Sequence, residues 1–302
     1  MRRKKSLVSR LLLGVMLLVT SCSTVPVTGR QQLDLVPRST MLTTSYQQYD
    51  QFLKENELSD DQRLAELVRS VGRDIQAAVE TYFRQNDMSE QLEGYRWEFH
   101  LMEGDKINAF AMPGGKIVVY EGIMDIAEDA NGLAVIMGHE IAHAVAGHGS
   151  ERMSQQLVTQ LGGMALSLAL SENPAKTQRL WMAAFGMGAQ VGFLLPYSRL
   201  HESEADHLGL IFMAMAGYNP KTAVAFWQRM KAKKKGQAPP EFLSTHPASG
   251  TRIEQISDWL PEVMPIYERN KKEQAAINPG EPMQSSPCTA DALDLLSRVA
   301  GG

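Results

Sequence analysis

Three histidines and one glutamate lie within the segment MGHEIAHAVAGH, residues 137–148, whose other residues are small or apolar. Residues four apart on an α-helix lie on one face, one turn apart, so His139 and His143 would project together. Two imidazoles placed in this way can bind one Zn²⁺ ion at about 2.0–2.1 Å. The Glu140 carboxylate, next to His139, can reach a metal-bound water without ligating the ion. Because buried polar side chains are costly without partners, this spacing predicts a metal site rather than packing alone.

A third protein ligand has to come from elsewhere in the chain. The longer metzincin motif places a glycine and a third histidine after the second histidine, and this sequence has Ala146 and Gly149 at those positions. His148 would point away from the histidine pair on an ideal helix. The nearby sequence therefore does not complete the metal site.

The segment HESEAD, residues 201–206, supplies candidate carboxylates. Glu202 and Asp206 are four apart and share one helix face, whereas Glu204 lies on the opposite side. One of the two carboxylates is expected to ligate the metal, and the other to accept a hydrogen bond from the free N–H of a ligand histidine. The alternative is that all three acidic residues form a solvated helix face.

Four segments in order resemble the M48 family of zinc metallopeptidases across roughly residues 60–260. The resemblance extends to periplasmic lipoprotein members and to the catalytic domain of a mitochondrial inner-membrane quality-control protease. It implies an α+β, mostly α, zincin-type metalloprotease domain with a small sheet, an active-site helix carrying His-Glu-x-x-His, and one Zn²⁺ per chain. The segments are NAFAMPGGKIVVYEG, GHEIAHAVAGH, SRLHESEAD and STHPASGTRI.

The resemblance also implies a role for each site residue. His139, His143 and Glu202 would ligate zinc, Glu140 would be the general base, and Asp206 would accept a hydrogen bond from a ligand histidine. From this sequence we expect neither the flanking membrane spans of integral members nor the C-terminal helical-repeat domain of one lipoprotein member. The substrates and partners of that member therefore do not transfer directly.

A further histidine, His246, follows in the segment STHPASG. Without the resemblance it would be interpreted as a surface residue. In lipoprotein relatives a histidine in the matching loop can approach the zinc, so we expect His246 to occupy the open ligand position and keep the enzyme latent. Arg199 and Arg252 are expected to pair with acidic neighbours.

A strand near the metal site is expected to hold the substrate. Asn108, Ala109, Phe110 and Ala111, in the segment INAFAM, would bind an extended peptide by β-strand addition. The alternative is that this segment is an ordinary internal strand.

The elements that must position these residues follow from hydrophobic periodicity and turn residues. Ser59 is the expected N-cap of a helix whose apolar residues continue to Tyr82. Apolar and polar residues alternate over residues 95–102, which predicts a strand with one face exposed to solvent. The two apolar stretches after the histidines are shorter than a membrane span and are interpreted as buried helices. The alternative is that they insert into the membrane. Further expected elements are strands on both sides of a turn at 113–115, a buried helix at 128–147, apolar helices at 158–170 and 180–195, a helix at 197–218 and another after Asn219-Pro220.

The N-terminal residues indicate the compartment. MRRKKSLVSR is basic, LLLGVMLLVT is apolar, and Val19–Cys22 resembles a lipobox in which Cys22 is lipidated. Ser23 resembles the residue that follows the cysteine in lipoproteins sorted to the outer membrane. We expect a bacterial cell-envelope protein held by its lipid on the outer membrane and facing the periplasm. The alternative is an ordinary signal peptide with a chance cysteine.

Composition gives the remaining expectations. Removing residues 1–21 removes five positive charges, so the formal net charge of −4 becomes −9, and no basic stripe remains to bind nucleic acid. With Cys22 lipidated, Cys288 is the only free thiol and no internal disulfide forms. The predicted organisation is a signal peptide (1–21), a lipidated N-terminus and tether (22–58), a peptidase domain (59–262) and a polar, flexible tail (263–302).

The expected function is a zinc endopeptidase whose partners are the lipid bilayer and unfolded or misassembled envelope proteins. Two alternatives remain. A chaperone-like lipoprotein would use its zinc structurally, although such a site needs no base at Glu140. A zinc aminopeptidase would need a group that recognises the free N-terminal amine, and no such motif is visible.

Overall fold

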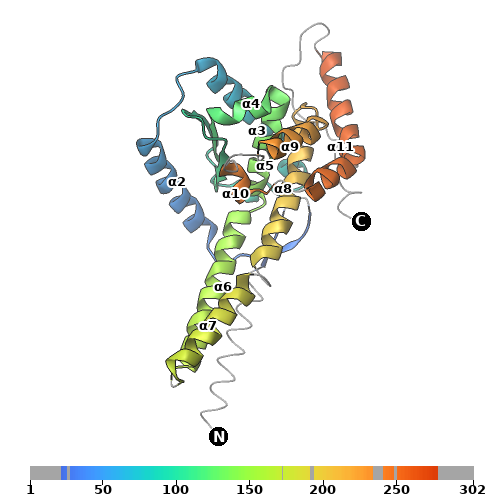
Figure 1. Ribbon diagram of the computed structural model, residues 1–302. Coiled ribbons are helices and arrows are strands. Elements are labelled where there is room, and N and C mark those ends of the chain that lie inside the picture. Colours follow the sequence, from blue (N-terminus) through green and yellow to red (C-terminus); the bar gives the residue numbers. More distant parts are fainter. Residues whose placement is uncertain are drawn as a thin grey trace. The chain divides into compact units, whose positions relative to one another are not determined.

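The structure is a computed structural model that describes residues 22–25, 28–171, 173–190, 194–233, 241–247 and 250–277 (Figure 1). The chain forms two compact units, Met1–Met41 with Gly147–Leu200 and Leu42–Ala146 with His201–Gly302. The predicted signal peptide, the Cys22 side chain and Cys288 lie outside the described residues.

The larger unit confirms the predicted α+β class, mostly helical with a small sheet. Two of its helices, α2 and α8, begin in the smaller unit. The elements are α2 (Arg38–Glu55), α3 (Gln62–Gln85), η1 (Ser89–Leu92), β3 (Glu98–Met102), β4 (Ala109–Met112), β5 (Lys116–Tyr120), η2 (Glu121–Ile123), α4 (Met124–Ala127), α5 (Ala130–Val145), α8 (Leu195–Met215), α9 (Thr222–Ala232), α10 (Glu241–Thr245) and α11 (Gly250–Ile277).

The sheet of the larger unit has the order β3-β5-β4, with β3 parallel and β4 antiparallel to β5. All five residues of the central strand β5 are buried, whereas β3 alternates at its start as predicted. The predicted turn between β4 and β5 is confirmed, because Gly114 and Gly115 have φ values of 90° and 85° that suit glycine. Helix α3 packs against β3, and α5 packs against both α3 and β4.

The N-cap of α3 differs from the prediction. The side chain of Asp61, not Ser59, accepts a hydrogen bond from the Leu64 N–H at 2.9 Å. Ser59 instead accepts one from the Asp61 N–H at 3.1 Å. Ser and Asp are comparable N-caps, so the local sequence could not choose between them.

The predicted tether contains a helix, α2. Tyr49 is 1% exposed and its hydroxyl hydrogen-bonds to His100 Nδ1 on β3 at 2.5 Å. It joins a core cluster with Met102, Val118 and Tyr120. The stretch was predicted as a tether because most of its residues are polar. Its few apolar residues nevertheless pack on the sheet.

The predicted flexible tail also begins too early. Helix α11 continues to Ile277, with Val263, Ile266 and Tyr267 buried at helical spacing. It contains Pro261 and Pro265, residues that usually end a helix because they lack an N–H donor. Packing of the apolar face retains the helix through both prolines.

The smaller unit contains the ribbon β1 (Cys22–Thr24) and β2 (Gln31–Leu33), with helices α6 (His148–Ala169) and α7 (Ala175–Ala189). The two helices lie side by side (Figure 1). The prediction of helices here is confirmed, but the prediction that they are buried is wrong, because much of their apolar surface is exposed. Among the described residues, no helix combines the length and apolar character needed to cross a bilayer.

Helices α5 and α8 cross with their backbones in contact at a pair of glycines. A Cβ on Gly138 would lie 2.9 Å from the carbonyl oxygen of Gly209. A Cβ on Gly209 would lie 2.9 Å from the His139 nitrogen. The nearest atoms are backbone, so a side chain at either position would separate the helices. This contact fixes the spacing between the histidine helix and the helix that carries Glu202.

Gly138→Ala is expected to lower the free energy of unfolding by about 1–3 kcal/mol, because the added methyl group overpacks the helix crossing. Urea denaturation followed by circular dichroism measures the change. Gly186→Ala, on α7 where no atom lies within 4 Å of the new Cβ, is the matched control and is expected to be neutral or slightly stabilising. Equal stability of the two variants would show that the crossing tolerates a methyl group.

Candidate metal centre

Helix α5 carries the histidine pair through the interior of the larger unit. Its N-cap, Asp129, accepts a hydrogen bond from the Gly132 N–H at 2.9 Å, and the chain leaves the helix at Gly147 with φ of 73°. These ends confirm the helix predicted from the pattern. His139 is 2% exposed, so its polar ring atoms need partners within the protein.

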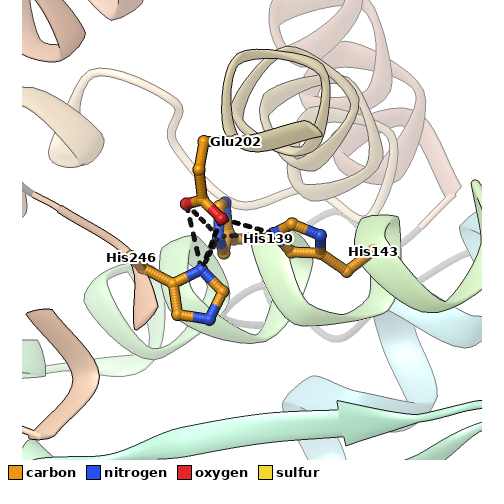
Figure 2. Close-up of side chains that lie close together, drawn as sticks. All are labelled: His139, His143, Glu202 and His246. Atoms are coloured by element: carbon orange, nitrogen blue, oxygen red, sulfur yellow. Dashed lines mark hydrogen bonds and ion pairs between the residues drawn. The ribbon is translucent and has the colours of Figure 1, made fainter. Parts of the chain in front are cut away.

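Four side chains from three separate parts of the chain converge on one point (Figure 2). His139 and His143 come from α5, Glu202 from α8, and His246 follows α10. The Nε2 atoms of His139 and His143 are 3.1 Å apart. The Glu202 carboxylate lies 3.5 Å from the first of these atoms and 3.4 Å from the second.

The separations between the donor atoms fit a tetrahedral metal ion. His246 Nδ1 lies 3.1 Å from His139 Nε2 and 2.9 Å from the Glu202 carboxylate. A tetrahedron with bonds of about 2.0–2.1 Å has edges of roughly 3.3–3.4 Å, close to these separations. Two imidazoles and a carboxylate, with a third imidazole at the remaining corner, form a donor set that suits Zn²⁺.

Asp206 orients the ring of His139. Its Oδ1 lies 2.9 Å from His139 Nδ1, so the Nδ1–H donates to the carboxylate and Nε2 is left with a lone pair that faces the cluster. Of the two carboxylates left open by the sequence, Glu202 lies in the cluster and Asp206 lies behind the histidine. The alternative of a solvated acidic face is wrong, because Glu202, Glu204 and Asp206 are 8%, 6% and 5% exposed.

Arg252, from α11, compensates these buried carboxylates. It forms ion pairs with Asp206 at 2.6 Å and Glu202 at 3.3 Å, and its guanidinium lies 3.4 Å from the centroid of the Trp227 ring. Pairing with acidic neighbours was expected for Arg252, but that these neighbours are Glu202 of the metal cluster and Asp206 behind it could not be predicted from the sequence. Arg199 is exposed.

Hydrogen bonds keep Glu202 ionised. Burial alone raises the pKa of Glu202, but hydrogen bonds from His139, His143 and His246 outweigh it and hold the pKa below its usual value. Burial lowers the pKa of His139, but its hydrogen bonds to Asp206 and Glu202 outweigh burial and raise the pKa to about 9. The ionised Glu202 carboxylate therefore attracts positive charge, which a metal ion can supply in place of a proton on His139.

Glu140 lies between the cluster and the sheet. Its Oε2 accepts a hydrogen bond from the Ala111 N–H on β4 at 3.0 Å. Its Oε1 is buried, has no hydrogen-bond donor among the described residues, and lies 3.6 Å from His246 Nε2. Burial raises the pKa of Glu140, which makes it a better proton acceptor than an exposed glutamate.

His246 is held by its own local contacts. Its backbone N–H donates to the Phe242 carbonyl at 2.8 Å, and its ring stacks on the Phe242 ring with centroids 4.5 Å apart. The sequence suggested His246 only through the family resemblance, and the structure places it in the cluster. His148, which was expected to point away, begins α6 and is not part of the cluster.

The predicted substrate strand forms an edge of the sheet. Because β5 is central, β4 has one side without a partner among the described strands. Asn108 O accepts from the Tyr120 N–H, and antiparallel pairs alternate, so the backbone groups of Ala109 and Ala111 point toward the open edge. The hydrogen bond from Ala111 to Glu140 has this direction. The unpaired edge therefore faces the side on which Glu140 lies. Along this edge Ala111 is partly exposed, whereas Ala109 is 1% exposed and is covered by other parts of the chain.

Comparison with known proteins identifies related chains. The sequence model of peptidase family M48 matches residues 70–260. Mitochondrial metalloendopeptidase OMA1 of Saccharomyces cerevisiae is 36% identical over 187 residues, which cover 59% of this chain and 51% of the relative. The human mitochondrial metalloendopeptidase OMA1 is 30% identical over 267 residues, covering 85% of this chain and 49% of that protein.

A bacterial relative is more distant. The beta-barrel assembly-enhancing protease of Escherichia coli is 25% identical over 189 residues, covering 59% of this chain and 37% of that protein. The chain thus spans about half the length of the OMA1 relatives and less of the bacterial one.

Proposed function

The chain belongs to peptidase family M48, and on that premise we propose that it is a zinc endopeptidase. The observation that carries the proposal is the convergence of His139, His143 and Glu202 beside the buried carboxylate of Glu140. Three ligands leave one position for substrate or water, as catalytic zinc sites require. A purely structural zinc site would not need a general base such as Glu140, whose Oε1 has no hydrogen-bond partner among the described residues.

The proposed chemistry divides between the ion and the chain. A bound Zn²⁺ would lower the pKa of water from 15.7 to about 7 and polarise the scissile carbonyl. Glu140 would take the proton of the attacking water through its free Oε1 and pass it to the leaving amine. Its Oε2, held by the Ala111 N–H, keeps the carboxylate oriented during this transfer. Asp206 fixes the His139 tautomer that presents Nε2.

Glu140→Gln is expected to abolish casein cleavage, with a loss of at least about 100-fold, because the amide cannot accept the proton. Zinc content, measured by mass spectrometry, is expected to stay near one per chain in both proteins. Glu241→Gln, on α10 and exposed, is the matched control. If the parent and both variants bind zinc and none of them cleaves casein, the chaperone-like alternative is favoured. If cleavage is confined to very short peptides, the aminopeptidase alternative is favoured.

We further propose that substrates bind in an extended form along β4. The group that supports this is the outward C=O of partly exposed Ala111, on the strand that contacts α5. The outward N–H and C=O of buried Ala109 would become available once the residues that cover them move. A peptide added here would pair through its backbone with little demand on its side chains. Such binding suits an enzyme that acts on unfolded protein.

Ala109→Pro tests the strand. Proline removes the N–H that faces the open edge but breaks no hydrogen bond to β5, because Ala109 and Val119 form a non-hydrogen-bonded pair. Casein cleavage is expected to fall at least about tenfold at equal zinc content. Because Ala109 is 1% exposed, the proline ring is also expected to lower thermal stability, so rates are compared at a temperature at which both variants are folded. Ala109→Ser keeps the N–H and is the control. Unchanged cleavage by the proline variant would exclude strand addition at this position.

We also propose that His246 keeps the enzyme latent. Its Nδ1 lies within 3.1 Å of both His139 Nε2 and the Glu202 carboxylate, so it competes with water for the fourth position. The loop that carries it must withdraw before a substrate carbonyl can enter. Latency of this kind would protect intact neighbouring proteins.

His246→Ala is expected to raise basal casein cleavage several-fold, because a water replaces the imidazole. Initial rates at equal zinc content measure the effect. His207→Ala removes a histidine that pairs with Glu262 outside the cluster, at 2.7 Å, and is expected to leave the rate unchanged. A lower rate in His246→Ala than in the parent would show that the imidazole assists catalysis rather than restraining it.

The proposed setting is the periplasmic face of the bacterial outer membrane, with the chain held by a lipid on Cys22. The proposed substrates are misfolded or misassembled envelope proteins, and the name of the Escherichia coli relative associates that protein with β-barrel assembly. Mass spectrometry of the mature N-terminus tests the anchor, and an unmodified Cys22 would exclude it.

A further inference from the structure

Helix α6 carries an apolar stripe that no described residue covers. Its members recur at intervals of three or four residues, which places them on one helix face. Leu161 is 59% exposed and Leu168 is 75% exposed, fractions that are unusual for large apolar side chains in a monomer. The complete stripe consists of Met153, Leu157, Leu161, Met164 and Leu168.

The stripe is not the face on which α6 meets α7. That contact uses Gly162 and Gly163, against which the Phe185 ring lies at 3.0 Å and 3.6 Å from the positions their Cβ atoms would occupy. Helix α7 in turn exposes Leu180, Trp181 and Met187. The hairpin of α6 and α7, visible in Figure 1, therefore has apolar surface both inside and outside. A large exposed apolar surface flanked by polar residues marks a site that contacts another protein or a membrane.

Charge distinguishes this hairpin from the rest of the chain. From residue 153 to residue 198 the sequence has only three charged residues, Glu172, Lys176 and Arg179. The two basic residues are exposed near the start of α7, one and a half turns or less from the exposed Trp181. A basic and aromatic end next to an apolar face is the composition of segments that lie in the headgroup region of a bilayer.

The N-terminal strands enter the same unit beside the beginning of the stripe. β1 pairs with β2, with Cys22 opposite Leu33. The chain then follows α6, since the Leu35 N–H donates to Ser154 Oγ at 2.9 Å and Arg30 pairs with Glu151 at 2.7 Å. Ser154 is adjacent in sequence to the first residue of the stripe. Strand β1, in which the described chain begins, thus lies near that end of α6.

We propose that the exposed apolar surface of the α6–α7 hairpin contacts a lipid bilayer with anionic headgroups. The stripe spans about 22 Å along α6, at roughly 1.5 Å per residue, and would sit at the boundary between headgroups and acyl chains. Lys176 and Arg179 would contact lipid phosphates, and Trp181 would lie at the level of the headgroups. The lipid contact does not require proteolytic activity. It can therefore be tested independently of the proposed peptidase function.

Brominated lipids test the contact. The full chain is reconstituted into phosphatidylethanolamine–phosphatidylglycerol vesicles with or without phosphatidylcholine brominated on its acyl chains. The difference in tryptophan fluorescence between the parent and Trp181→Phe isolates the emission of Trp181 from that of the other three tryptophans. Bromolipid is expected to quench this component at least twofold. Equal quenching in the parent and in Trp181→Phe would overturn the proposal, whether or not the N-terminus holds the chain on the vesicle.

Variants of the stripe extend the test. Leu161→Gln with Leu168→Gln is expected to reduce the quenching of Trp181 at least twofold, with helicity checked by circular dichroism. Leu58→Gln, at a large apolar residue of the other unit that is 48% exposed, is the matched control and is expected to change nothing. Lys176→Gln with Arg179→Gln is expected to remove the dependence of quenching on phosphatidylglycerol.

A second copy of the chain is the competing occupant of the stripe. It would shield Trp181 from iodide in the absence of vesicles, and this shielding would weaken on dilution. That outcome, together with absence of bromolipid quenching, would replace the bilayer by a dimer contact.

Discussion

The close crossing of α5 and α8 determines what the larger unit can do. At Gly138 and Gly209 the two backbones meet without intervening side chains. His139 follows the first of these glycines directly, and Asp206 lies less than one turn before the second. A ring nitrogen and a carboxylate oxygen can then approach to 2.9 Å without long, flexible side chains. Short side chains on close helices lose little entropy when they are fixed, which suits a site that must hold a metal in one geometry.

The crossing also concentrates charge in a buried region. Glu140, Glu202 and Asp206 are all less than 9% exposed, and among the described residues Arg252 forms the ion pairs with Glu202 and Asp206. A divalent cation would add positive charge next to these buried carboxylates. Isolated buried charges are strongly destabilising, so metal binding and folding of this region are expected to support each other. Arg252 on α11 pairs with the buried carboxylates of Glu202 and Asp206. These ion pairs explain why a helix distant in sequence lies against the site.

Sequence spacing predicted the parts of the site that lie on single elements. The helix with His139 and His143, the shared face of Glu202 and Asp206, and the turn at Gly114 and Gly115 follow from local geometry. What sequence could not supply depends on contacts between elements. The different positions of Glu202 and Asp206, the pairing of Arg252, and the glycine contact between helices appear only after folding. The exposed hairpin was predicted as buried because apolar composition alone does not show whether other parts of the chain cover a helix.

The hydrogen bond between Ala111 and Glu140 ties the sheet edge to the proposed base. Since strand residues alternate in direction, a peptide paired to this edge would have a register fixed relative to Glu140 by main-chain geometry. The enzyme would then recognise a substrate by its free backbone amides and carbonyls rather than by particular side chains. A folded protein has already paired its amides internally and must first open a segment, at a free energy set by its own local stability. An enzyme that binds substrates at such an edge would cleave a nearby protein at a rate that depends on how often that protein unfolds locally. Proteins of low local stability would be cleaved first.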